Sequence, residues 1–138
     1  MIKSFASRLK STRDDATEIV EYHFDRIALN TPEDVEAFFS DFTISLGQHP
    51  KPLDVIVCLD SFTVAPAARE SYGLIRAKVA KGYYRHSARY AGIPQTRIAT
   101  MTSAVLYQAE GLVYDTREKA IEAILQARVK AAKKGPAL

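Results

Sequence analysis

The stretch LDVIVCL, residues 53–59, limits the fold more than any other part of the chain. Every residue in it except Asp54 is apolar. A short, continuous apolar run is typical of a strand that is covered on both faces, as in a largely parallel sheet. Such a strand needs layers packed on both of its sides, so the sequence predicts an α/β fold with helices against a sheet.

The segment before this run has a different pattern. In residues 17–24, Val20, Tyr22 and Phe24 alternate with Glu21 and His23. Period-two alternation predicts a half-buried strand, with Glu21 and His23 on its polar face.

Residues 30–47 carry the signals of a helix. Thr31 suits the N-cap, Pro32 suits the first helical position, and Gly47 is placed to end the helix. The apolar residues at helical spacing are Val35, Phe38, Phe39, Phe42 and Leu46. We expect this face to pack in the core.

The second half of the chain repeats the strand and helix order. Helices are predicted over 67–83, 96–111 and 115–135, and strands over 84–92 and 112–114. With the segments before them, these give a strand–helix unit repeated about four times. The prediction is one α/β domain, with about four strands in a mostly parallel or mixed sheet and helices packed against it.

Two of these helices allow finer predictions. In the helix over 96–111 the apolar face consists of Ile98, Met101, Val105 and Leu106. In the last helix, Asp115 and Glu118 have the spacing of a capping box.

The 138 residues suit one domain, which we place at 16–134 with a tail at 135–138. In residues 1–15, Ile2, Phe5 and Leu9 could share one face of a short helix surrounded by basic residues, as in a membrane-surface anchor. We favour a loosely ordered or docked segment instead, because chain termini are commonly loose.

The single cysteine, Cys58, lies within the apolar run. It cannot form an intrachain disulfide, and its position predicts a buried, unreactive thiol. No apolar run approaches the roughly 20 residues that span a bilayer, and the N-terminus lacks the apolar core of a secretory signal. These features predict a cytoplasmic protein.

Charge is distributed unevenly along the chain. Residues 14–60 contain eleven acidic and two basic residues, whereas residues 69–97 contain seven basic residues and one acidic residue. This asymmetry predicts electrostatic contact with another surface or with a second copy of the protein.

The sequence lacks the common motifs of catalysis and cofactor binding. The sequence has no glycine-rich phosphate loop and no GxSxG nucleophile elbow. His23, His49 and His86 are far apart, and one cysteine cannot supply a structural zinc site. We therefore expect no catalytic residues, metal or cofactor, and a protein that is not an enzyme.

Tyrosines and basic residues are interleaved between residues 72 and 90. That mixture resembles a nucleic-acid footprint, but Tyr72 and Tyr83 fall on the core face of a predicted helix, so nucleic acid is not favoured. Arg85, His86 and Arg89 remain candidate contacts for an anion or a partner, since guanidinium groups suit carboxylate and phosphate.

The phenylalanines of the helix over 30–47 also allow a second interpretation. Core packing explains Phe38, Phe39 and Phe42 well. Alternatively, with Met101 and Leu106, they could line a pocket for a small apolar ligand.

The order of elements and two segments resemble the STAS domain, in particular SpoIIAA-like proteins. Phe62-Thr63-Val64 matches the hydrophobic-Thr-hydrophobic step of that family, and Ala67 starts the helix after it. VYDTREKAIEAIL, residues 113–125, is similar to the closing strand and helix. The resemblance covers residues 17–130 and implies the STAS α/β fold and a regulatory role.

The chain departs from that family at one position that matters. Where the antagonists of the family have Asp-Ser, this chain has Pro66-Ala67. A phosphate is well placed at a helix N-terminus, but alanine cannot accept one. The resemblance therefore implies a binding surface without the phosphorylation switch.

Two functions follow from these observations. The first is a non-enzymatic interaction module that contacts a protein partner or a second copy. Its contact residues would be Ser61, Thr63, Ala67, Ala68 and Ser71. The second is a SpoIIAA-like binder of a small apolar or lipid-like ligand, with the basic N-terminal segment aiding peripheral contact with an anionic membrane.

Overall fold

The computed structural model describes residues 4–107 and 112–134, and a mixed five-stranded sheet lies at its centre. The strand order is β1-β2-β4-β6-β7. β1 runs antiparallel to β2, and the other neighbours are parallel. The strands are β1 (Leu9–Arg13), β2 (Ile19–Phe24), β4 (Leu53–Cys58), β6 (Tyr84–Tyr90) and β7 (Val113–Tyr114).

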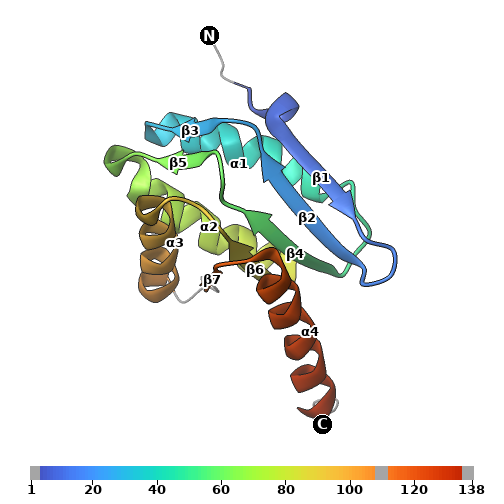
Figure 1. Ribbon diagram of the computed structural model, residues 1–138. Helices are drawn as coiled ribbons and strands as arrows, with labels where there is room; N and C mark the ends of the chain where they lie inside the picture. The colour runs from blue at the N-terminus through green and yellow to red at the C-terminus, as the bar shows by residue number, and fades with distance from the viewer. Residues whose placement is uncertain (1–3, 108–111, 135–138) are drawn as a thin grey trace.

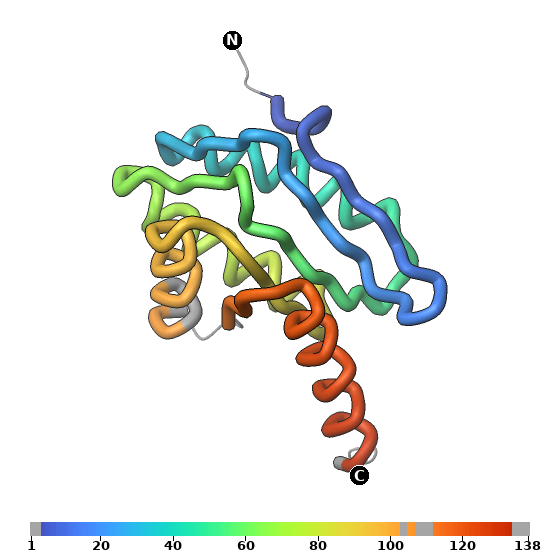
Figure 2. Tube along the Cα trace, viewed as in Figure 1, coloured from blue at the N-terminus to red at the C-terminus, as the bar shows by residue number. Residues whose placement is uncertain are grey.

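Helices lie on both faces of this sheet (Figure 1). α1 (Pro32–Leu46) and α2 (Arg69–Tyr83) cover one face, and α4 (Arg117–Lys134) packs on the other. α3 (Pro94–Tyr107) lies beside α2, and the C-terminal part of α4 extends beyond the sheet (Figure 2). The predicted single-domain α/β fold with a mixed sheet is confirmed.

Strand β4 is buried along its whole length, as the apolar run predicted. Leu53, Val55 and Val57 belong to the core between the sheet and the helices α1 and α2. Ile56 and Cys58 face α4. The alternation of a strand therefore supplies two separate cores from one short segment.

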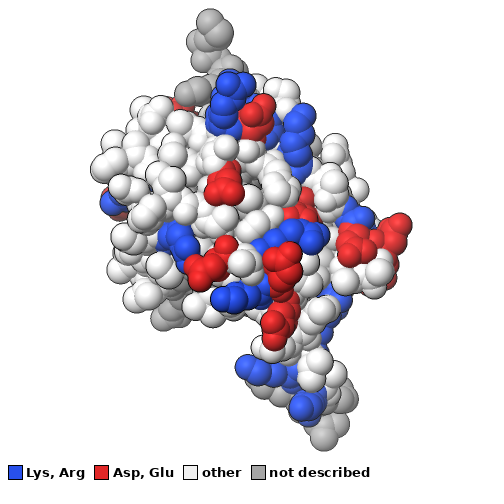
Figure 3. Space-filling view, viewed as in Figure 1, with Lys and Arg blue, Asp and Glu red and all other residues white. Residues whose placement is uncertain are grey.

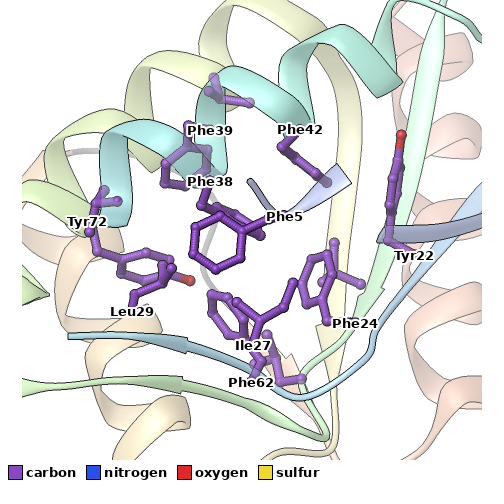
Figure 4. Close-up of a cluster of buried hydrophobic side chains, with 14 of the residues drawn as sticks. Phe5, Tyr22, Phe24, Ile27, Leu29, Phe38, Phe39, Phe42, Phe62 and Tyr72 are labelled. Carbon is purple, nitrogen blue, oxygen red and sulfur yellow. The ribbon is translucent and has the colours of Figure 1, made fainter. Parts of the chain in front are cut away.

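Aromatic rings fill the larger of these cores (Figure 4). The ring of Phe38 lies 5.4 Å from the ring centroids of both Phe24 and Phe62, and 6.0 Å from that of Phe5. Such tilted and edge-on pairs add to the stabilisation from apolar burial. The predicted helix face of α1 is thus confirmed as core.

The cap of α1 is confirmed, whereas the cap predicted for α4 is wrong. At α1, the Oγ1 of Thr31 accepts a hydrogen bond from the backbone N–H of Asp34 at 3.1 Å. At α4, Thr116 is the capping residue and its Oγ1 accepts from the N–H of Lys119 at 3.3 Å. Asp115 instead forms an ion pair with Arg97 of α3.

The N-terminal segment is part of the domain, so the boundary predicted at residue 16 is wrong. Residues Leu9–Arg13 form β1, and Phe5 is 1% exposed. The backbone N–H of Phe5 also donates to Asp41 Oδ2 at 2.8 Å. The segment is docked, because its one large aromatic side chain fills a site between α1 and the sheet.

The sequence did not reveal a second, two-stranded sheet. β3 (Ile27–Leu29) pairs in parallel with β5 (Phe62–Val64), and the 3₁₀ turn η2 (Pro66–Ala68) leads from β5 into α2. Both strands have only three residues, too few for a clear alternation. Ser61 precedes β5 with a φ of +60°, and its carbonyl accepts the N–H of Ile27 at 2.8 Å.

The docked N-terminus can be tested with Phe5→Ala. Large-to-small substitution of a buried phenylalanine leaves a cavity, so we expect the free energy of unfolding to fall by about 3 kcal/mol in urea titration. Ile44→Ala is the control, because Ile44 is 64% exposed on α1 and its loss should cost under about 0.5 kcal/mol. Equal effects of the two substitutions would contradict the docking of Phe5.

Candidate functional site

The junction between β5 and α2 exposes most of the residues predicted to contact a partner. Ser61, Thr63 and Ala67 are exposed, and Ser71 is half-buried. Ala68 is fully buried beneath the turn, so its prediction as a contact residue is wrong. The small exposed side chains leave the backbone of this turn open to close approach.

Helix α3 lies directly beside this junction and packs through small and polar residues. Thr96 Oγ1 donates to the carbonyl of Phe62 at 2.8 Å, and the hydroxyl groups of Tyr72 and Thr100 lie 3.2 Å apart. Thr96, Ala99 and Thr100 are all buried. Their spacing of three and four residues places them on one side of the helix. The side of α3 that carries small and polar residues therefore packs against β5 and α2.

The opposite side of α3 presents its large apolar residues to solvent. Ile98 is 55% exposed, Met101 39%, Val105 81% and Leu106 65%. The four residues share one face as predicted, and that face is exposed to solvent. Below, the "α3 apolar face" means these four residues. Surface helices normally have the reverse arrangement, with apolar residues inside.

This face is also nearly without charge. The sequence of α3, PQTRIATMTSAVLY, contains one side chain that is charged at neutral pH, Arg97. Arg97 Nη2 lies 3.1 Å from Asp115 Oδ1, so its charge is paired within the fold. Figure 3 shows few charged side chains on the side of the molecule where α3 and β5 lie.

The five residues predicted to line an apolar pocket lie in two separate places. Phe38, Phe39 and Phe42 line a cavity of about 30 Å³ between α1, α2 and the sheet. Met101 and Leu106 do not line it and lie on the α3 apolar face. The grouping of these five residues is therefore wrong.

The residues predicted to contact an anion also lie in different parts of the fold. Arg89 is 3% exposed and lines the cavity of the three phenylalanines. Arg85 lies toward the other face, where its Nε and Nη2 donate to the two oxygens of Asp54 at 3.0 and 2.6 Å. His86 is half-buried and pairs in register with Asp54. The three residues do not form one contact surface.

Asp54 is a buried carboxylate held between two elements. Besides Arg85 of β6, Arg128 of α4 donates to it through Nε at 2.6 Å. Burial raises the pKa of Asp54, but the hydrogen bonds from Arg85 and Arg128 outweigh burial and hold the pKa below its ordinary value of 3.8. Asp54 therefore stays ionised and links the sheet to α4.

The charge asymmetry of the sequence is partly cancelled inside the fold. Of the basic residues in 69–97, Arg76 and Arg89 are buried, while Arg85 and Arg97 are ion-paired. The acidic segment supplies Asp54 as a partner. Residues 69–97 therefore do not form one continuous basic face.

A second buried carboxylate, Glu21, is held by three side chains. The Tyr90 hydroxyl donates to Glu21 Oε2, His23 Nε2 lies 3.0 Å from the same oxygen, and Arg117 Nε donates to Oε1 at 2.7 Å. Burial raises the pKa of Glu21, but these bonds outweigh it and lower the pKa. Burial and the bond to Glu21 raise the pKa of Tyr90. Neither group is adjusted for proton transfer near neutral pH, so the cluster anchors α4.

Within residues 4–107 and 112–134, no three His, Cys, Asp or Glu side chains gather in a way that could hold a metal ion. Within the same residues, no helix has both the length and the apolar character needed to cross a membrane. Comparison with protein-family models, curated proteins and solved structures found no match.

Glu21 and Arg89 were predicted at the surface and are buried. The burial of Asp54 and Arg76 was missed, although the sequence held a signal for these two. Asp54 was the single charged residue in an apolar run that was predicted to be buried on both faces. Arg76 falls at helical spacing between Tyr72 and Val79, on the face assigned to the core. A charge at a position that the pattern buries indicates either an ion pair or a site.

The Asp54 pair can be tested with Asp54→Asn. We expect the free energy of unfolding to fall by about 2 kcal/mol near pH 7. Removing one partner of a fully buried ion pair costs roughly 3–5 kcal/mol, and the cost is smaller here because Arg85 is 44% exposed. The folded pKa is depressed, so the contribution is present above about pH 4 and lost as the pH falls through the folded pKa. Urea unfolding of both proteins should give a constant difference from about pH 5 to 8 that shrinks below about pH 4. A difference that grows on acidification would contradict this role.

Proposed function

We propose that this chain is a non-enzymatic, STAS-like protein-interaction module that acts through the α3 apolar face. The observation that carries the proposal is the reversed polarity of α3, which buries Thr96 and Thr100 and exposes Ile98 and Val105. Exposed apolar patches of this kind mark interaction surfaces. The exposed Ser61 and Thr63 flank Phe62, whose carbonyl accepts a hydrogen bond from Thr96 on the buried side of α3.

The partner that fits this face best is a second copy of the chain. Ile98, Met101 and Val105 follow one another at spacings of three and four residues, the spacing by which helices pack side by side. The face has no free charge that would select an oppositely charged partner, and two such faces do not repel each other. A twofold axis would place the same stripe on both sides of the contact.

Regulatory use and location are supported by the sequence alone. The resemblance to STAS domains supports a regulatory role, and the alanine at position 67 supports one without phosphorylation there. The lone cysteine, Cys58, is buried and unpaired, which is compatible with a reducing, cytoplasmic compartment.

A second candidate function is the binding of a small ligand between helices and sheet. The cavity beside Phe38, Phe39 and Phe42 favours it. Contact with a membrane surface through the N-terminus has less support, because Phe5 is buried in the core and Arg13 is paired with Asp15 at 3.2 Å.

Val105→Glu tests the interaction surface. We expect the unchanged protein to form dimers in sedimentation equilibrium at micromolar concentration. Glutamate at residue 105 would bury an unpaired charge in the contact, so the dissociation constant should rise by more than about tenfold.

Ile44→Glu is the matched control, because it places the same charge at an exposed isoleucine on α1. It should leave the dimer unchanged. A wild-type protein that stays monomeric at all concentrations, or equal dissociation by both substitutions, would contradict the proposal.

A further inference from the structure

Arg89 is a buried cation in the aromatic core. It lies on β6 in register with Val57, whose side chain belongs to the core between the sheet and the helices α1 and α2. Only 3% of Arg89 is exposed. A guanidinium group does not lose its proton in a protein, so Arg89 keeps its positive charge there.

The contacts of Arg89 do not balance this charge. Its Nη2 donates to the neutral Ser87 Oγ at 2.9 Å. Its Nη1 is buried and has no hydrogen-bond partner among the described residues. An uncompensated buried charge is strongly destabilising, whereas an anion on the same group would remove most of that cost.

Arg89 lines the cavity of the three phenylalanines. Other rings of the cavity wall are Phe24, Phe62 and Tyr72, which turn toward one another in Figure 4. The cavity measures about 30 Å³, room for about two water molecules. Among the described residues, no Asp or Glu lines it.

Two more polar groups face the same space. Arg76 lines the cavity, and its Nη2 donates to the carbonyl of Thr100 at 3.3 Å. Tyr84 also lines it; burial raises the pKa of its phenol, and the nearby guanidinium groups of Arg89 and Arg76 oppose that rise. The cavity therefore combines positive charge at one side with aromatic walls at the other.

We propose that this cavity binds a small monocarboxylate of about the size of acetate. Its carboxylate would accept from Nη1 of Arg89, since guanidinium donors match carboxylate geometry. Its methyl group would lie against the phenylalanine rings. Phosphate fits less well, because it carries more charge and needs more donors than the apolar walls supply.

This inference does not depend on dimer formation through α3. The cavity is formed by α1, α2 and the sheet, whereas the α3 apolar face points to solvent. It does change the second candidate function, because a buried guanidinium selects an anion over an uncharged apolar molecule.

Saturation-transfer NMR with sodium acetate tests the site. Saturation of aromatic protons should pass to the acetate methyl group in the wild-type protein. Arg89→Met, which keeps an unbranched side chain and removes the charge, should reduce that signal by more than about tenfold. Because it removes an unbalanced buried charge, it should also leave the urea midpoint in acetate-free buffer undiminished.

Arg69→Met is the matched control, since it removes the same charge from an exposed arginine at the start of α2. It should leave the acetate signal unchanged. Three results would overturn the proposal: no transfer in the wild-type protein, an equal signal in Arg89→Met, or displacement of acetate by equimolar chloride. A lowered urea midpoint for Arg89→Met would also count against it, because it would assign Arg89 a structural role.

Discussion

The burial of β4 on both faces is the constraint on which the rest of the structure depends. One side of the strand requires the aromatic layer of α1 and α2, and the other requires α4. Because Asp54 lies within this strand, its carboxylate must also be neutralised, and Arg85 and Arg128 do so from β6 and α4. The ion pair therefore follows from the strand, and it fixes α4 against the sheet. The Glu21 cluster adds a second anchor to the same helix.

Helix α3 is the exception to this layered plan. It packs through Thr96, Ala99 and Thr100, whose small side chains allow close approach to α2 and β5. Close approach through small residues leaves the large apolar residues on the outside. The fold thus produces an uncharged apolar surface beside the exposed turn after β5, and the proposed self-association would bury it. In the aromatic core, Arg89 is a second exception, because no described residue balances its charge.

The elements that periodicity predicted are those whose large residues pack inward. The apolar run of β4 and the capped helix α1 follow this rule. The half-buried strand predicted for β2 is wrong, because Glu21 is buried on the face that was predicted to be polar. The rule does not hold for α3, where the larger apolar side chains are exposed and hydrogen-bonding threonines are buried. It failed also for three-residue strands, which are too short for a pattern. Phe5 was missed because its burial depends on a site assembled by α1. The candidate sites depend on pairing across the fold, and sequence spacing does not reveal which face Arg85 and Arg89 each occupy.

In the proposed dimer, α3 carries the contact between two copies of the chain. Intermolecular NOEs in a mixture of ¹³C-methyl-labelled and unlabelled protein test it most directly, because they identify the touching side chains rather than the mass of the complex. The account predicts intermolecular NOEs to the methyl groups of Ile98, Met101 and Val105. It predicts none to Ile44, which is exposed on α1. Intermolecular NOEs confined to the exposed stripe of α4, at Leu125 and Val129, would contradict the account.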